Sequence, residues 1–146
     1  MKAVLLVESL TGNTWKAAER VGSLLQQANW SITGLLRLRE PVHSAIQDAD
    51  FVVVGTWVDG LFVVGQRPRG ASSIAKLPIM RGKKAAVFCT FALHPGRTLD
   101  KLTSEVMGRG PDVLGGVAMN RRKLDEHSEV FVERLLANLP PAMSDR

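Results

Sequence analysis

The chain has 146 residues, of which 45% are hydrophobic and 23% are charged, a balance typical of a soluble globular protein. Its one cysteine, Cys89, excludes an internal disulfide framework and a cysteine-based zinc site. No apolar run is long enough to cross a bilayer, so we expect a cytoplasmic protein without a membrane span. The net charge is +5, but the basic residues are scattered apart from Arg121, Arg122 and Lys123. Because no nucleic-acid-binding motif accompanies them, we expect no nucleic-acid partner.

Along the whole chain, continuous apolar runs alternate with segments whose apolar residues recur every three or four positions. The runs predict five buried strands, at residues 3–7, 30–38, 50–56, 84–89 and 113–119. The segments between them predict helices at 14–28, 44–48, 71–76 and 99–106, and a last helix with Asp125 as its N-cap. Strands that alternate with helices indicate a parallel sheet covered on both faces. We expect residues 1–146 to form a single domain.

Three of the predicted strands end in loops of unusual chemistry. These loops are residues 8–14, 56–70 and 90–96, and they follow the first, third and fourth strands. Ligands of such sheets bind beyond the carboxyl ends of the strands. In the strand order 2-1-3-4-5 the three loops would lie side by side, so we expect a ligand there.

The first loop lies between a buried strand and a helix. Four of its residues surround Gly12 with hydroxyl and amide groups, namely Ser9, Thr11, Asn13 and Thr14. A helix start adds free N–H groups and the positive end of the helix dipole, so the loop suits a phosphate. It lacks the lysine of the Walker motif, which argues against nucleotide hydrolysis. The simpler alternative is that the hydroxyls only cap the helix.

The second and third loops each carry an aromatic side chain. Trp57 stands between a buried strand and Gly60, a position that suits stacking on a flat ring but is also typical of a core or lid tryptophan. The third loop contains Phe91 and His94, and a lone histidine is more often an ordinary loop residue. The apolar segment 61–64 fits either a buried lid or an exposed patch for a partner.

Together, these loops resemble those of the flavodoxin family. The stretch Ser9-Leu10-Thr11-Gly12-Asn13-Thr14 matches that family's phosphate loop, (S/T)-x-T-G-x-T, at each specified position. Residues 55–60 are similar to its second flavin loop, in which an aromatic side chain stacks on the isoalloxazine of FMN, and residues 90–96 take the place of the third. The resemblance implies a flavodoxin-like three-layer α/β/α sandwich that binds FMN without a covalent link. Its five-stranded parallel sheet would have the order 2-1-3-4-5.

The same resemblance implies where the cofactor is held. The phosphate would lie in the first loop, at Ser9, Leu10, Thr11, Gly12, Asn13 and Thr14. The ring would lie against the second loop, at Thr56, Trp57, Val58, Asp59 and Gly60. The third loop would contribute Thr90, Phe91, His94 and Gly96. No catalytic side chain and no metal ligand are expected.

The function that the resemblance implies is electron carriage between protein partners through FMN. Because the chain is basic, we expect redox partner proteins with acidic surfaces. We also expect the protein to be a monomer. Two alternatives remain open. One is an NAD(P)H-dependent FMN reductase acting on a quinone-like small acceptor, although no nicotinamide site is recognisable. The other is a non-catalytic binding module of the same fold. We assign no role to Cys89, expected to be buried, or to His43 and His127, which are isolated and expected to be exposed.

The chain departs from typical flavodoxins in its charge. Flavodoxins are typically strongly acidic and carry a tyrosine in the third loop, whereas this chain has no tyrosine and no carboxylate between Thr90 and Arg97. With Arg67, Arg69, His94 and Arg97 expected near the ring, an anionic reduced flavin would be held more easily. We therefore expect a less negative potential for the final reduction step than in acidic flavodoxins.

Overall fold

The structure is a computed structural model that describes residues 1–58 and 71–140. Asp59, Gly60, the apolar segment 61–64, Arg67 and Arg69 lie outside the described residues. None of the described helices is long and apolar enough to pass through a membrane.

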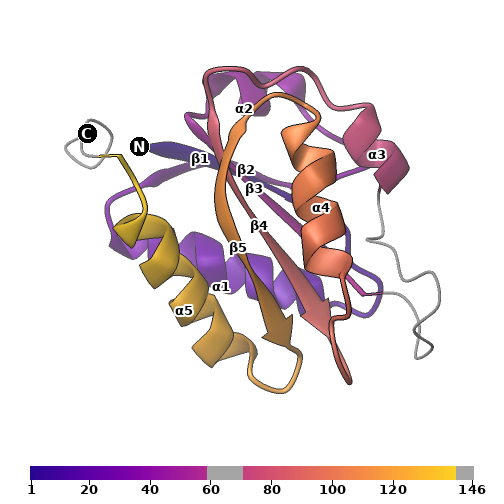
Figure 1. Cartoon of the computed structure of the whole chain (residues 1–146). Helices are drawn as coiled ribbons and strands as arrows, with labels where there is room; N and C mark the ends of the chain where they lie inside the picture. The colour runs from indigo at the N-terminus through magenta and orange to yellow at the C-terminus, as the bar shows by residue number, and fades with distance from the viewer. Residues whose placement is uncertain (59–70, 141–146) are drawn as a thin grey trace.

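Five parallel strands form one sheet in the order β2-β1-β3-β4-β5 (Figure 1). The strands are β1 (Lys2–Val7), β2 (Ser31–Arg37), β3 (Phe51–Trp57), β4 (Lys84–Phe91) and β5 (Asp112–Asn120). The three central strands are buried along most of their length, as the continuous apolar runs of the sequence require. The predicted fold class and strand order are confirmed.

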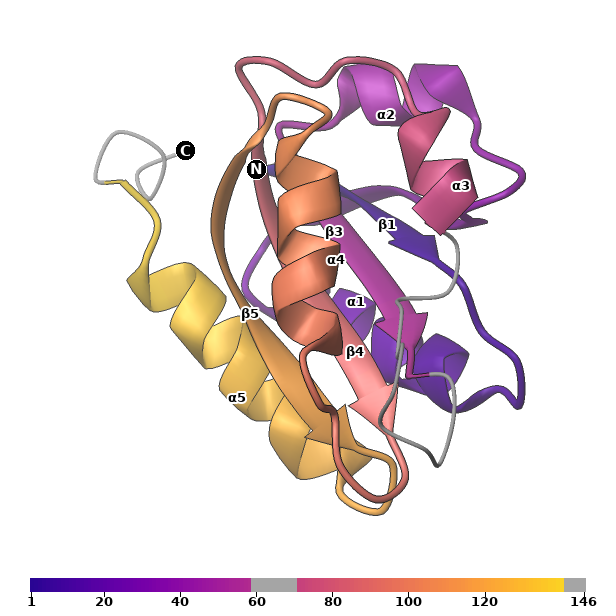
Figure 2. The same cartoon turned by 45° about the vertical axis from the view of Figure 1, so that its right-hand side comes forward.

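Helices cover both faces of the sheet and make three layers (Figure 2). One face carries α1 (Asn13–Gln27) and α5 (Leu124–Ala137), and the other carries α2 (His43–Asp48), α3 (Ala71–Ala75) and α4 (Thr98–Met107). Alternate residues of β1 divide between the two layers, because successive side chains of a strand point to opposite faces. Leu5 packs in the same cluster as Phe131 of α5, whereas Leu6 packs with Leu102 of α4.

Gly55 of β3 allows an aromatic contact across the sheet. A Cβ at this position would lie 2.2 Å from Cζ of Phe88, its neighbour on β4. The Phe88 ring therefore occupies the space above Gly55, and it meets Phe131 of α5 edge to face, with the ring centroids 5.6 Å apart. This contact fixes α5 against the centre of the sheet.

Some predicted details of the elements are wrong. β3 and β4 continue to Trp57 and Phe91, so residues predicted to open the second and third loops are the last residues of strands. They remain in the sheet because pairing with the neighbouring strand extends that far. α5 begins at Leu124 with Lys123 as its N-cap, so Asp125 lies in the first turn, where its charge still suits the helix dipole.

Cys89 of β4 is fully buried, as expected. Burial raises the pKa of its thiol to about 12, so the reactive thiolate is scarce at neutral pH.

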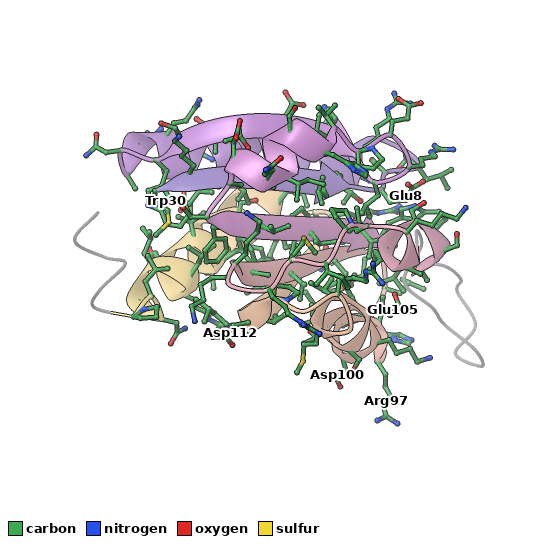
Figure 3. All side chains as sticks on the ribbon, turned by 90° about the horizontal axis from the view of Figure 1, so that it is seen from above. Glu8, Trp30, Arg97, Asp100, Glu105 and Asp112 are labelled. Carbon is green, nitrogen blue, oxygen red and sulfur yellow. The ribbon has the colours of Figure 1, made fainter. Side chains whose placement is uncertain are left out.

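Glu105 on α4 has a partly buried carboxyl group, and burial disfavours its charged form. Among the described residues its Oε2 atom is buried and has no hydrogen-bond partner, and burial raises the pKa of its carboxyl above the ordinary value of 4.5. Figure 3 shows Glu105 and Asp100 at different positions around the same helix. A carboxyl that binds its proton more tightly in the folded protein lowers stability as the pH rises above the unfolded pKa.

Replacing this charge tests that argument. We expect Glu105→Gln to raise the melting temperature at pH 7, because the amide has no charge to desolvate. The difference should shrink as the pH falls through the unfolded pKa and vanish below about pH 3, where the wild-type carboxyl is protonated in both states. Thermal unfolding followed by circular dichroism measures both values, with the exposed Glu133→Gln as control. A lower melting temperature for Glu105→Gln at pH 7 would contradict this account.

Candidate functional site

A cavity of about 370 Å³ lies at the carboxyl edge of the sheet. Its volume is within the range of about 300–1,000 Å³ common for small-molecule sites. It is lined by Leu10, Thr11, Asn13, Thr14, Trp57, Val58, Thr90, Phe91, Ala92, Leu93, His94 and Arg121. The strands point toward this edge, at the lower right of Figure 1. A smaller hollow of about 190 Å³ between β5 and α5 contains none of the predicted site residues.

Most of the predicted cofactor-binding residues that the structure describes line the larger cavity. They are Leu10, Thr11, Asn13, Thr14, Trp57, Val58, Thr90, Phe91 and His94. Four described residues do not line it, namely Ser9, Gly12, Thr56 and Gly96. Asp59 and Gly60 lie outside the described residues.

The first loop turns into α1 at Gly12, which has a left-handed φ of 92°. The first hydrogen bond within the helix runs from the Lys16 N–H to the Gly12 carbonyl, so the amides of Asn13 and Thr14 have no partner inside the helix. The Trp15 amide donates to Ser9 Oγ at 3.3 Å. Of the hydroxyls in this loop, Ser9 is the one that caps the helix, and the capping alternative does not explain Thr11 or Thr14.

The other two hydroxyls have different partners. Thr11 Oγ1 accepts a hydrogen bond from Asn13 Nδ2 at 3.3 Å, which leaves its own proton to be donated to a ligand. Thr14 Oγ1 lies 2.8 Å from Thr90 Oγ1, and both threonines are buried. The carbonyl of Thr90 also accepts from the Val58 amide at 2.9 Å. Thr90, in β4, therefore joins the start of α1 to the chain that follows β3.

Two aromatic side chains lie beside this junction. Trp57 ends β3 and Phe91 ends β4, and both are half-buried and line the cavity. The structure thus brings these two aromatic residues to the same cavity as the start of α1. Such an arrangement suits a ligand with an anionic group at one end and a planar ring at the other.

Arg121, Ala92 and Leu93 are cavity residues that the sequence reasoning missed. Arg121 follows β5, and its amide donates to the Phe91 carbonyl at 3.0 Å. A signal for it exists in the sequence, because Arg121 opens the tight basic cluster 121–123 directly after the fifth predicted strand. In the confirmed strand order, the end of β5 lies beside the end of β4.

The charges near the cavity also differ from expectation. Arg97 extends outward from the start of α4 (Figure 3) and does not line the cavity. Glu8, the carboxylate directly before the first loop, pairs with Arg39 at 3.6 Å and does not line it either. His127 is half-buried rather than exposed, because its Nδ1 accepts the Asn120 amide at 2.9 Å. The described residues contain no group of three or more His, Cys, Asp or Glu that could hold a metal ion.

The sequence model of the flavodoxin domain matches residues 4–109, which is most of the chain. The chain belongs to the flavodoxin family. The match covers the first, second and third loops of this flavodoxin domain and ends before Arg121. A comparison with curated proteins found no match.

Solved flavodoxin structures share the fold of this flavodoxin domain. The oxidised Flavodoxin 1 of Bacillus cereus is 20% identical, with a TM-score of 0.69 over 96% of this chain and 100% of that chain. The two-electron reduced flavodoxin of Megasphaera elsdenii is 17% identical, with a TM-score of 0.64 over 86% and 97%. Rubredoxin oxygen:oxidoreductase of Desulfovibrio gigas is 18% identical, with a TM-score of 0.69 over 94% of this chain and 36% of that chain.

Gly12 offers a test of the turn before α1. We expect Gly12→Ala to destabilise the protein by about 1–2 kcal/mol, because a residue with a Cβ is strained in the left-handed region. The matched control is Gly22→Ala in the same helix, where a Cβ meets nothing within 4 Å. There alanine should stabilise the helix by about 0.5–1 kcal/mol. Urea unfolding measures both changes, and equal effects at the two positions would refute a special role for Gly12.

Proposed function

We propose that the protein binds FMN non-covalently in the cavity at the carboxyl edge of the sheet and carries electrons between protein partners. The observation that carries this proposal is the joining, in one cavity, of an anion-binding turn with two aromatic side chains. Membership of the flavodoxin family supports the same ligand.

The residues at one end of the cavity fit a phosphate. The amides of Asn13 and Thr14, which have no partner inside the helix, and the hydroxyl of Thr11 are donors, and the start of α1 adds the positive end of its dipole. Gly12 leaves open space beside them, since a Cβ placed there would meet nothing within 4 Å. The turn contains no lysine or arginine, so a phosphate would be held by hydrogen bonds and the helix dipole.

The residues further along the sheet edge fit a flat ring. Trp57 and Phe91 supply aromatic faces, and the side chain of His94 lies on the same lining. Bound FMN would supply the one- and two-electron chemistry. The chain's own part is to hold the phosphate, orient the ring between the second and third loops, and limit the access of water.

The residues at the rim of the cavity suit contact with a partner protein that has an acidic surface. Leu10 and Leu93 line the cavity and are 68% and 69% exposed, and exposed apolar groups at a site are typical of contact surfaces. The exposed basic turn 121–123 lies at the same edge. Charges of opposite sign on the partner would speed the encounter.

An electron carrier and a nicotinamide-dependent reductase differ in whether NADH or NADPH alone reduces the bound flavin. We expect the FMN-loaded protein to keep its flavin absorption under anaerobic NADH or NADPH alone, and to lose it when dithionite is added. Visible spectroscopy follows both additions. Rapid bleaching by either nicotinamide would favour the reductase over the carrier.

A hydroxyl substitution tests the phosphate role. We expect Thr11→Val to weaken FMN binding by about 1.5 kcal/mol, or about tenfold in Kd, because a hydrogen bond to a charged group is lost. Riboflavin, which lacks the phosphate, should bind the variant and the wild type equally. Quenching of tryptophan fluorescence measures both ligands, and Thr103→Val on α4 serves as the control. Equal losses for FMN and riboflavin would refute the phosphate role, and no FMN binding by the wild type would refute the proposed function.

A further inference from the structure

Arg121 stands at the opposite end of the cavity from the phosphate turn. The turn follows β1, whereas Arg121 follows β5, and two strands lie between β1 and β5 in the sheet. Three strand spacings amount to about 14 Å. Arg121 is therefore too far along the edge to share in the phosphate turn, and it lies beyond Trp57 and Phe91, on the side where a ring would extend.

The backbone of Arg121 is held firmly in this place. Its amide donates to the Phe91 carbonyl at 3.0 Å, which extends the pairing of β4 with β5. Asn120, the residue before Arg121, fixes the turn through three hydrogen bonds. Its amide donates to His127 Nδ1 at 2.9 Å, its side-chain oxygen accepts from the Arg122 amide at 2.9 Å, and its carbonyl accepts from the Lys123 amide at 2.9 Å. The guanidinium thus extends from a fixed point on the cavity wall.

No described carboxylate neutralises this guanidinium. Arg121 is the one permanently charged side chain among the cavity residues that the structure describes. The ion pairs found within residues 1–58 and 71–140 join other residues, including Glu8 with Arg39. Asp125 and Glu126 lie nearby in sequence but belong to the first turn of α5 and do not line the cavity.

We propose that Arg121 is the counter-charge for the reduced flavin ring, an inference that rests on the proposed function. Uptake of two electrons and one proton from a low-potential donor protein leaves the ring with one negative charge. A cation on the cavity wall stabilises that charge but has little effect on the neutral oxidised ring. Arg121 would thereby favour the reduced state. It was not among the four residues expected near the ring, namely Arg67, Arg69, His94 and Arg97, of which His94 lines the cavity and Arg97 does not.

The test compares the affinities for oxidised and reduced FMN. We expect Arg121→Gln to leave the Kd for oxidised FMN within about twofold and to raise the Kd for dithionite-reduced FMN about tenfold. That ratio corresponds to a fall of about 30 mV in the two-electron midpoint potential. Arg121→Lys should restore most of the loss, because it restores the charge. Anaerobic calorimetry measures the affinities and potentiometry measures the midpoint.

Arg122→Gln is the matched control, since it removes the same charge from the same turn at a residue that does not line the cavity. Arg122→Gln should change the ratio of the Kd for reduced FMN to the Kd for oxidised FMN less than threefold. If the Kd for reduced FMN relative to that for oxidised FMN rises equally in both variants, a general surface field would explain the effect and the proposal would be overturned. If Arg121→Gln weakens the binding of oxidised and reduced FMN equally, the residue has a structural role and the proposal would also be overturned. Failure of the wild type to bind either form would instead sink the proposed function.

Discussion

The candidate site depends on hydrogen bonds that continue the sheet beyond the carboxyl ends of its strands. Amides donate across neighbouring strands at about 3 Å, from Glu8 to Gly55, from Val58 to Thr90, and from Arg121 to Phe91. The hydroxyl pair of Thr14 and Thr90 adds a buried link between the start of α1 and the end of β4. Because each loop leaves the sheet from a fixed point, the cavity walls are positioned before any ligand arrives.

The two ends of the cavity would stabilise negative charge by different groups. The proposed phosphate turn at residues 9–14 has no cationic side chain and offers amides, hydroxyls and the dipole of α1. The far end has the guanidinium of Arg121, while the nearest carboxylate to the turn, Glu8, is paired with Arg39. The two ends are three strand spacings apart, so a permanent anionic group and a negative charge that forms only on reduction can be stabilised independently. Salt should weaken the effect of the exposed guanidinium more than that of the turn.

Local patterns in the sequence were sufficient for the strands, the fold class and most of the residues that line the cavity. The turn 9–14 was predictable because strand, glycine and helix start are adjacent in the chain. The strand ends at Trp57 and Phe91 were not, because pairing with a distant strand decides where a strand stops. Arg121 was missed for the same reason, since its place in the cavity follows from strand order rather than from any motif. The Asn120–His127 bond likewise closes a turn that local sequence does not mark.

The most direct test of the central claim is a backbone amide NMR titration of the protein with FMN. The account predicts saturable shifts that are largest at the start of α1, at Val58, at Phe91–His94 and at Arg121, the residues that line the cavity. Residues around the smaller hollow between β5 and α5, such as Leu114 and Leu135, should not shift. Shifts centred on that hollow, or no saturable shift at the carboxyl edge, would contradict the account.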